Sequence, residues 1–167
     1  MNKVIIVGSA RKDGNTAAVV NELKLLLGCE VIDLNDYNIG YYDYENANRT
    51  DDYLPLMERI IENYDLLILA TPVYWYAMSG IMKVFFDRLT DLVTIEKALG
   101  RKLKGKKMAV VSCSAGGNLG EFFWLPFKES AQYLAMEYVC DAHTVVGEDN
   151  TARIAAFAKA IDNATSV

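Results

Sequence analysis

The chain has 167 residues, enough for one domain that buries about 68–70% of the surface its unfolded chain exposes. Its 22 acidic side chains outnumber its 17 lysines and arginines, and the net charge of -5 argues against nucleic acid or an anionic membrane as main partner. The three cysteines are widely spaced, which gives neither a disulfide framework nor metal-ligand spacing and fits a reducing compartment.

The N-terminus carries one lysine and a four-residue apolar run, which is too short for a signal peptide. No apolar stretch approaches the ~18 residues that are needed to cross a bilayer. We therefore expect a cytoplasmic protein whose residues 1–167 form a single domain.

Strand-like and helical patterns alternate along the chain. Apolar runs predict five strands, at Val4–Val7, Cys29–Leu34, Leu66–Ala70, Met108–Ser112 and Tyr138–Val146. Amphipathic spacing predicts helices at Asn15–Leu27, Asp52–Asn63, Ser79–Leu89 continuing toward Leu99, about Trp124–Ala135, and Thr151–Ile161. Apolar strands separated by amphipathic helices indicate an α/β fold with a parallel sheet covered on both faces. Right-handed crossovers give a three-layer sandwich, most simply with strand order 2-1-3-4-5.

Residues 35–51 interrupt this alternation with a polar, tyrosine-rich insertion that has no clear periodicity. Loops of this length are uncommon in compact domains and are often functional. Tyr41, Tyr42 and Tyr44 either cover the insertion or act beside the active site, and the pattern does not choose between these roles.

The loop at residues 8–16, here called the phosphate loop, lies between the first strand and the first helix. A helix N-terminus leaves backbone N–H groups unpaired, and its dipole favours negative charge. Ser9, Arg11, Asn15 and Thr16 add side-chain donors to these groups. The combination predicts a binding site for a phosphate.

Two further loops should meet the phosphate loop, because ligands bind beyond the carboxyl ends of parallel strands at the switch point of the sheet. In the aromatic loop, residues 71–80, Tyr74 and Trp75 offer rings for stacking. In the glycine loop, residues 113–118, Gly116 and Gly117 allow a ring edge to approach the backbone closely. A phosphorylated planar ligand suits the three loops together.

Two motifs at the corresponding strand ends carry a resemblance to a known family. They read Gly8-Ser9-x-Arg11-x-x-Gly14-Asn15-Thr16 and Thr71-Pro72-Val73-Tyr74-Trp75 with Met78-Ser79-Gly80-x-x-Lys83-x-Phe85-x-Asp87-Arg88. The chain resembles the NAD(P)H-dependent FMN reductase family of flavodoxin-like proteins. The resemblance implies a flavodoxin-like fold and an FMN cofactor. It also implies three groups of cofactor contacts: the phosphate site Ser9, Arg11, Gly14, Asn15 and Thr16; the isoalloxazine lining Pro72, Val73, Tyr74 and Trp75; and the opposite edge Ala115, Gly116 and Gly117.

The insertion resembles that of the iron–sulfur flavoproteins, a branch of these proteins in which a compact group of cysteines holds a cluster. Here the insertion contains Tyr41, Tyr42 and Tyr44 and no cysteine. An iron–sulfur cluster requires thiolate ligands, so we expect neither a cluster nor another metal site.

The resemblance implies an enzyme that takes hydride from NADH or NADPH and reduces a quinone, a nitro or azo compound, a metal ion or a similar small acceptor. The residues show no catalytic triad or paired carboxylates, and His143 is expected in the last strand, so we expect no catalytic side chain. The alternatives are a flavodoxin-like one-electron carrier and a flavin-binding regulator without turnover.

The helix at residues 79–89 bears on assembly. Met78, Met82 and Phe85 share one face, and Val84 and Phe86 lie off it. An apolar surface that extends so far around a helix predicts a subunit contact, and we expect a homodimer or homotetramer.

Overall fold

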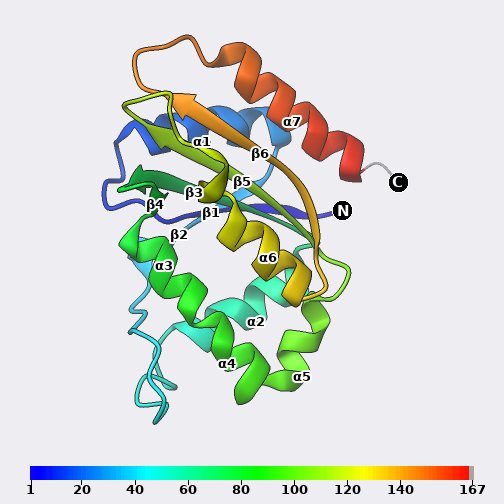
Figure 1. Cartoon of the computed structure of the whole chain (residues 1–167). Coiled ribbons are helices and arrows are strands. Elements are labelled where there is room, and N and C mark those ends of the chain that lie inside the picture. Colours follow the sequence, from blue (N-terminus) through cyan, green and yellow to red (C-terminus); the bar gives the residue numbers. More distant parts are fainter. Residues whose placement is uncertain (166–167) are drawn as a thin grey trace.

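A computed structural model describes residues 1–165. Five parallel strands form the central sheet, in the order β2-β1-β3-β5-β6. They are β1 (Lys3–Val7), β2 (Glu30–Asp33), β3 (Leu66–Tyr74), β5 (Lys107–Ser114) and β6 (Glu137–Val145). Figure 1 shows their carboxyl ends at one edge of the molecule. The predicted α/β class, the five strands and their flavodoxin-like order are confirmed.

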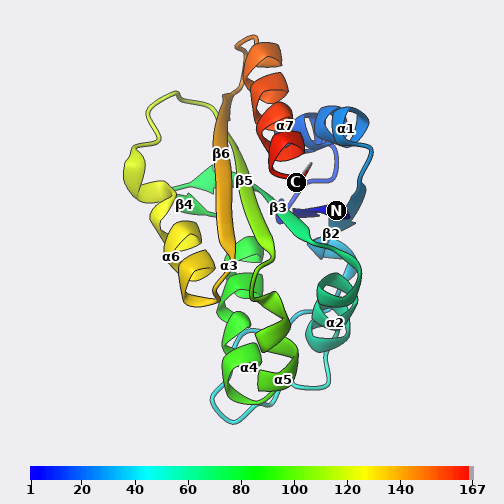
Figure 2. The same cartoon turned by 90° about the vertical axis from the view of Figure 1, so that its right-hand side faces the viewer.

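Helices cover both faces of the sheet (Figures 1 and 2). One face carries α1 (Asn15–Leu27) and α7 (Thr151–Thr165). The other carries α2 (Tyr53–Asn63), α3 (Gly80–Asp87), α4 (Leu89–Thr94), α5 (Lys97–Gly100) and α6 (Leu125–Tyr133). Single 3-10 turns occupy Leu34–Asp36, Arg101–Leu103 and Glu121–Phe123. Successive strand residues alternate between the layers: Val4 and Ile6 face the α2–α6 layer, and Ile5 and Val7 pack with α1 and α7.

The aromatic loop contains an element that the sequence did not predict. The two-residue strand β4 (Ala77–Met78) folds back antiparallel on Val73 and Tyr74. Trp75 and Tyr76 form the turn with φ angles of 50° and 61°. A two-residue hairpin of this kind needs positive φ at both central residues. Glycine or asparagine normally signals such a turn, and neither stands here.

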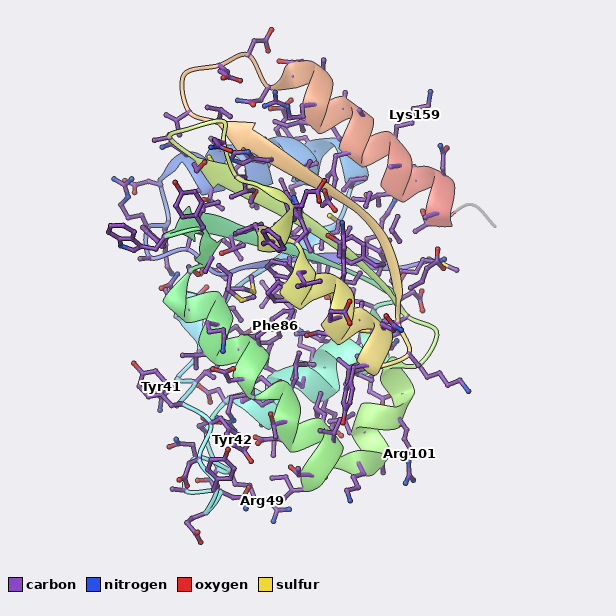
Figure 3. All side chains as sticks on the ribbon, in the orientation of Figure 1. Tyr41, Tyr42, Arg49, Phe86, Arg101 and Lys159 are labelled. Atoms are coloured by element: carbon purple, nitrogen blue, oxygen red, sulfur yellow. The ribbon has the colours of Figure 1, made fainter. Side chains whose placement is uncertain are left out.

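The predicted helix from Ser79 toward Leu99 is divided into α3, α4 and α5. The prediction that Phe86 lies off the buried face of this helix is wrong. Phe86 is buried between α3 and α6 (Figure 3). Its ring meets Phe127 edge to face, with centroids 5.2 Å apart. The packing of α6 on this side of α3 explains the difference. Within residues 1–165, no helix combines the length and apolar character needed to span a membrane.

Arg88, between α3 and α4, anchors the insertion to the helical layer. Its Nε donates to Asp91, and both Nη atoms donate to Asp51. Its remaining two donors bind the carbonyls of Gly40 and Asn48 at 3.1 and 3.2 Å. All five N–H groups of the guanidinium are therefore satisfied, which fixes an insertion that has little regular structure of its own.

Candidate functional site

The phosphate loop follows β1, the aromatic loop begins within the last four residues of β3, and the glycine loop begins within the last two residues of β5. These strands are neighbours and parallel, so the three loops emerge at the same edge of the sheet (Figure 1). The structure thus places at one edge of the sheet the three segments that the sequence predicted to meet. The described residues contain no group of three or more histidine, cysteine, aspartate or glutamate side chains that could hold a metal ion.

The start of α1 is open to an anion. Gly14 precedes the helix in an extended conformation and supplies no side-chain cap. No acceptor within residues 1–165 takes the N–H groups of Asn15, Thr16 or Ala17. Uncapped amides at a helix N-terminus suit a phosphate, because they donate hydrogen bonds and the helix dipole favours negative charge.

Side chains complete this part of the site. Ser9 and Thr16 are buried, whereas Arg11 and Asn15 are exposed. A Cβ placed on Gly14 would lie 3.5 Å from the Cβ and Nε of Arg11, so the arginine folds back over the loop. Asn35 supports the loop from outside, since its Nδ2 donates to the Ser9 carbonyl at 2.5 Å. The Ser9 hydroxyl donates to the Arg11 carbonyl at 3.3 Å, so its proton is engaged within the loop, and the amides at the start of α1 are the donors that stay open.

Ser79 ties the phosphate loop to the aromatic loop. Its hydroxyl donates to the Gly8 carbonyl at 2.5 Å and accepts from the Met82 amide at 3.1 Å, which caps α3. Its amide donates to Thr71 Oγ1 at 3.0 Å. A Cβ on Gly8 would lie only 2.8 Å from the Cβ of Met82, so this approach requires glycine. Sequence reasoning gave Ser79 no site role, although a serine three residues before a helical amide is a capping signal.

The hairpin presents its side chains unequally. Pro72 and Val73 are half-buried, whereas Tyr74, Trp75 and Tyr76 are exposed, Trp75 to 95%. The Trp75 ring therefore stands at the tip with almost no protein around it. Backbone strain of the kind found at positions 75 and 76 is concentrated at functional sites in proteins.

The backbone of the glycine loop has open space around it. Ala115, Gly116 and Gly117 are exposed. A Cβ on Gly116 would meet nothing within 4 Å, and one on Gly117 would meet only Val145 Cγ2 at 4.0 Å. A side chain at either position would therefore not clash with the rest of the protein. The two glycines leave room for a flat group to reach the backbone.

His143 of β6, which sequence reasoning placed only in a strand, lies beside the glycine loop. Its Nε2 is 2.7 Å from the hydroxyl of Ser114, the last residue of β5. Burial lowers the pKa of His143, and the nearby Arg153 lowers it further against the opposing effect of Glu148. The imidazole is therefore neutral at neutral pH. Cys113, the preceding residue of β5, is buried.

These residues fit FMN. Hydroxyls, a guanidinium and free amides suit its phosphate. Exposed aromatic rings and an unobstructed glycine backbone suit a planar ring system. The fit rests on the chemistry of the donors and on the space at Gly116.

Comparison with known proteins adds independent information. A family model described as NADPH-dependent FMN reductase matches residues 1–151. YwqN of Bacillus subtilis (strain 168), whose name proposes a NAD(P)H-dependent FMN-containing oxidoreductase, is 36% identical over 94 residues, 53% of this chain and 51% of YwqN. A NADPH azoreductase of Bacillus sp. (strain OY1-2) is 28% identical over 120 residues, 72% of this chain and 62% of the azoreductase. The chain thus spans between half and two thirds of the length of these curated relatives.

Among solved structures, the chain is similar to the Trp repressor binding protein of Bacillus subtilis. The TM-score is 0.76 at 20% identity, and the match covers 96% of this chain and 97% of the other. At this identity the likeness bears on the fold alone, and it agrees with the strand order of the sheet.

Proposed function

The chain belongs to the NADPH-dependent FMN reductase family, and from this premise we propose that it is an FMN-dependent oxidoreductase. It takes hydride from NADH or NADPH and passes it to a small acceptor such as a quinone, a nitro or azo compound or a metal ion. The observation that carries the proposal is the uncapped start of α1, which lies at the same sheet edge as an open glycine loop and an exposed aromatic hairpin.

We propose that different residues bind the phosphate and the ring of FMN. Ser9, Arg11, Asn15 and Thr16 hold the phosphate, together with the free amides at the start of α1. Pro72, Val73, Tyr74 and Trp75 line the ring, and the edge of the ring faces Ala115, Gly116 and Gly117.

When bound, FMN supplies the redox chemistry by accepting and donating a hydride equivalent. The chain supplies orientation and hydrogen-bond donors toward atoms that gain negative charge. Preorganised backbone N–H groups stabilise such charge without a change in protonation. The proposed reaction therefore requires no side-chain acid or base.

The proposal is tested with protein purified from cells and reconstituted with FMN. Turnover is measured with NADH and with NADPH against a quinone, an azo dye, a nitroaromatic compound and ferric citrate. Turnover with at least one donor and one acceptor is expected. A protein that binds FMN but turns over with no pair would contradict the enzyme proposal and agree with the one-electron carrier.

We also propose a homodimer, built on the groove between α4 and α6. Leu89, Val93, Tyr133 and Leu134 line this groove, which has a volume of about 500 Å³. Tyr133 is 77% exposed in the single chain. Thr90, Glu129, Ser130 and Gln132 add polar groups to the lining. Apolar side chains with polar neighbours and an exposed tyrosine are typical of a protein contact.

Sedimentation velocity at micromolar concentration tests the homodimer. We expect about twice the monomer mass for the unaltered protein and a shift toward monomer for Val93→Glu. The matched control, Val31→Glu, changes a half-buried valine on the edge strand β2, away from the groove. A monomeric unaltered protein would contradict this assembly.

A further inference from the structure

The contact between Ser114 and His143 links the edge strand to the glycine loop. Ser114 Oγ lies 2.7 Å from His143 Nε2 and donates to the Gly116 carbonyl at 2.8 Å. In the β5–β6 pairing, Ser114 is opposite Val145 and Ser112 is opposite His143. His143 and Val145 are two residues apart, so their side chains project from the same face of β6.

The protons that are available decide which group donates in the contact between Ser114 and His143. A hydroxyl has one proton, and that of Ser114 is used in the bond to the Gly116 carbonyl. The bond to His143 therefore requires an Nε2–H that donates to the serine oxygen. The neutral imidazole must be the Nε2–H tautomer, because the other tautomer would take the serine proton and leave Gly116 without its donor.

The fixed carbonyl orients the next amide. The Gly116 C=O and the Gly117 N–H belong to one planar trans peptide, in which they point in opposite directions. With the carbonyl held toward Ser114, the Gly117 N–H points away from it. No acceptor within residues 1–165 takes this N–H.

We propose that His143 is a positioning residue, which through Ser114 holds the 116–117 peptide so that the Gly117 N–H donates to the edge of the flavin. This inference rests on the proposed function. A glycine pair without side-chain contacts would otherwise sample many orientations, so the relay fixes the peptide before the cofactor binds. A fixed donor at this edge stabilises the reduced flavin more than the oxidised flavin, since reduction adds negative charge to the ring.

The first test reads the tautomer directly. The chain contains a single histidine, so tag-free, ¹⁵N-labelled protein gives one set of imidazole signals. Long-range ¹H–¹⁵N spectra at neutral pH are expected to show a protonated Nε2 and an unprotonated Nδ1. In Ser114→Ala the two nitrogens should move toward the averaged values of a free imidazole. An unprotonated Nε2 in the unaltered protein would overturn the proposal, and this result needs no variant to fold.

The second test compares affinities for oxidised and reduced FMN. Ser114→Ala and His143→Leu should weaken the binding of reduced FMN about tenfold more than that of oxidised FMN. For a two-electron couple, this lowers the midpoint potential by about 30 mV. His143→Gln keeps an amide donor near the position of Nε2 and should stay within about twofold of the unaltered protein. Ser130→Ala, on α6, controls for the loss of a hydroxyl.

The outcomes separate this inference from the proposed function. Folded Ser114→Ala and His143→Leu variants with an unchanged ratio of the two affinities would overturn the relay alone. If His143→Gln behaved like His143→Leu, the retained amide donor would not restore the contact, and this result would also count against the relay. An unaltered protein that binds neither form of FMN would instead refute the proposed function.

Discussion

Arg88 and Asp51, 37 positions apart in the chain, are joined by two hydrogen bonds of 2.5 and 3.3 Å. Both side chains are almost fully buried, and that of Arg88 is 2% exposed. Burial alone would raise the pKa of Asp51, but the bond from Arg88 and the amides of Tyr53 and Gly40 together lower it. Arg88 also lies over the buried Tyr53 ring, 4.7 Å from its centroid. The pair fastens the insertion to the helical layer.

Replacing Arg88 should destabilise the protein severely. Arg88→Leu leaves the carboxylates of Asp51 and Asp91 buried without their partner, and breaking a buried pair in this way costs about 3–5 kcal/mol. Urea denaturation measures the free energy of unfolding. The control is Arg49→Ala, which removes an exposed pair with Glu96 and should cost less than about 1 kcal/mol. Equal losses in the two variants would contradict the anchoring role.

Asp51 should make stability depend on acid pH. Its pKa in the folded protein lies below the ordinary value of 3.8, so the folded state favours the charged form. Its contribution is complete above that value and is lost as the pH falls through the lower, folded pKa. Denaturation between pH 5 and pH 2 should show a smaller loss of stability for Asp51→Asn than for the unaltered protein. Parallel curves for the two proteins would rule this contribution out.

The turn at Trp75 and Tyr76 should be strained. A residue with a side chain in the left-handed region costs of order 1 kcal/mol, so Tyr76→Gly should raise the free energy of unfolding by about 0.5–1 kcal/mol. Tyr41→Gly is the control, since Tyr41 is exposed and has no positive φ. A less stable Tyr76→Gly protein would show that the turn is not strained.

Arg11 should carry much of the affinity for the phosphate of FMN. A hydrogen bond to a charged group contributes about 1.5–3 kcal/mol, so Arg11→Ala should weaken binding about ten- to hundredfold. Fluorescence titration of the apoprotein measures the dissociation constant. Lys24→Ala removes the same charge from the last turn of α1, at the opposite end of the helix, and should change it less than threefold. Similar effects in both variants would mean that only net charge matters.

Much of the fold was predictable because it follows from patterns that are local in sequence. The apolar runs of β1, β3 and β5 and the spacing of α1 fix the layers, and the order of strands then follows from the handedness of crossovers. The three loops of the candidate site were predictable for the same reason: parallel strands place their carboxyl ends together.

Three features could not be predicted, each for a different reason. The β4 hairpin depends on left-handed backbone at Trp75 and Tyr76, which no glycine or asparagine signals. Arg88 belongs to the second motif, but no local pattern shows that it is buried, because its partners Asp51, Gly40 and Asn48 come from the distant insertion. The place of His143 depends on a register shift between Met108 and Ala109 in the β5–β6 pairing. A shift of one residue changes which side chains share a face, and apolar patterning does not reveal it.

Anaerobic stopped-flow mixing measures hydride transfer from the nicotinamide to the bound FMN. FMN-loaded protein is mixed with excess NADH or NADPH, and the flavin absorbance near 450 nm is followed. We expect rapid bleaching with at least one nicotinamide, followed by recovery when an acceptor is added in a second mix. Protein that binds FMN tightly, yet keeps its absorbance for minutes with both nicotinamides, would contradict this expectation.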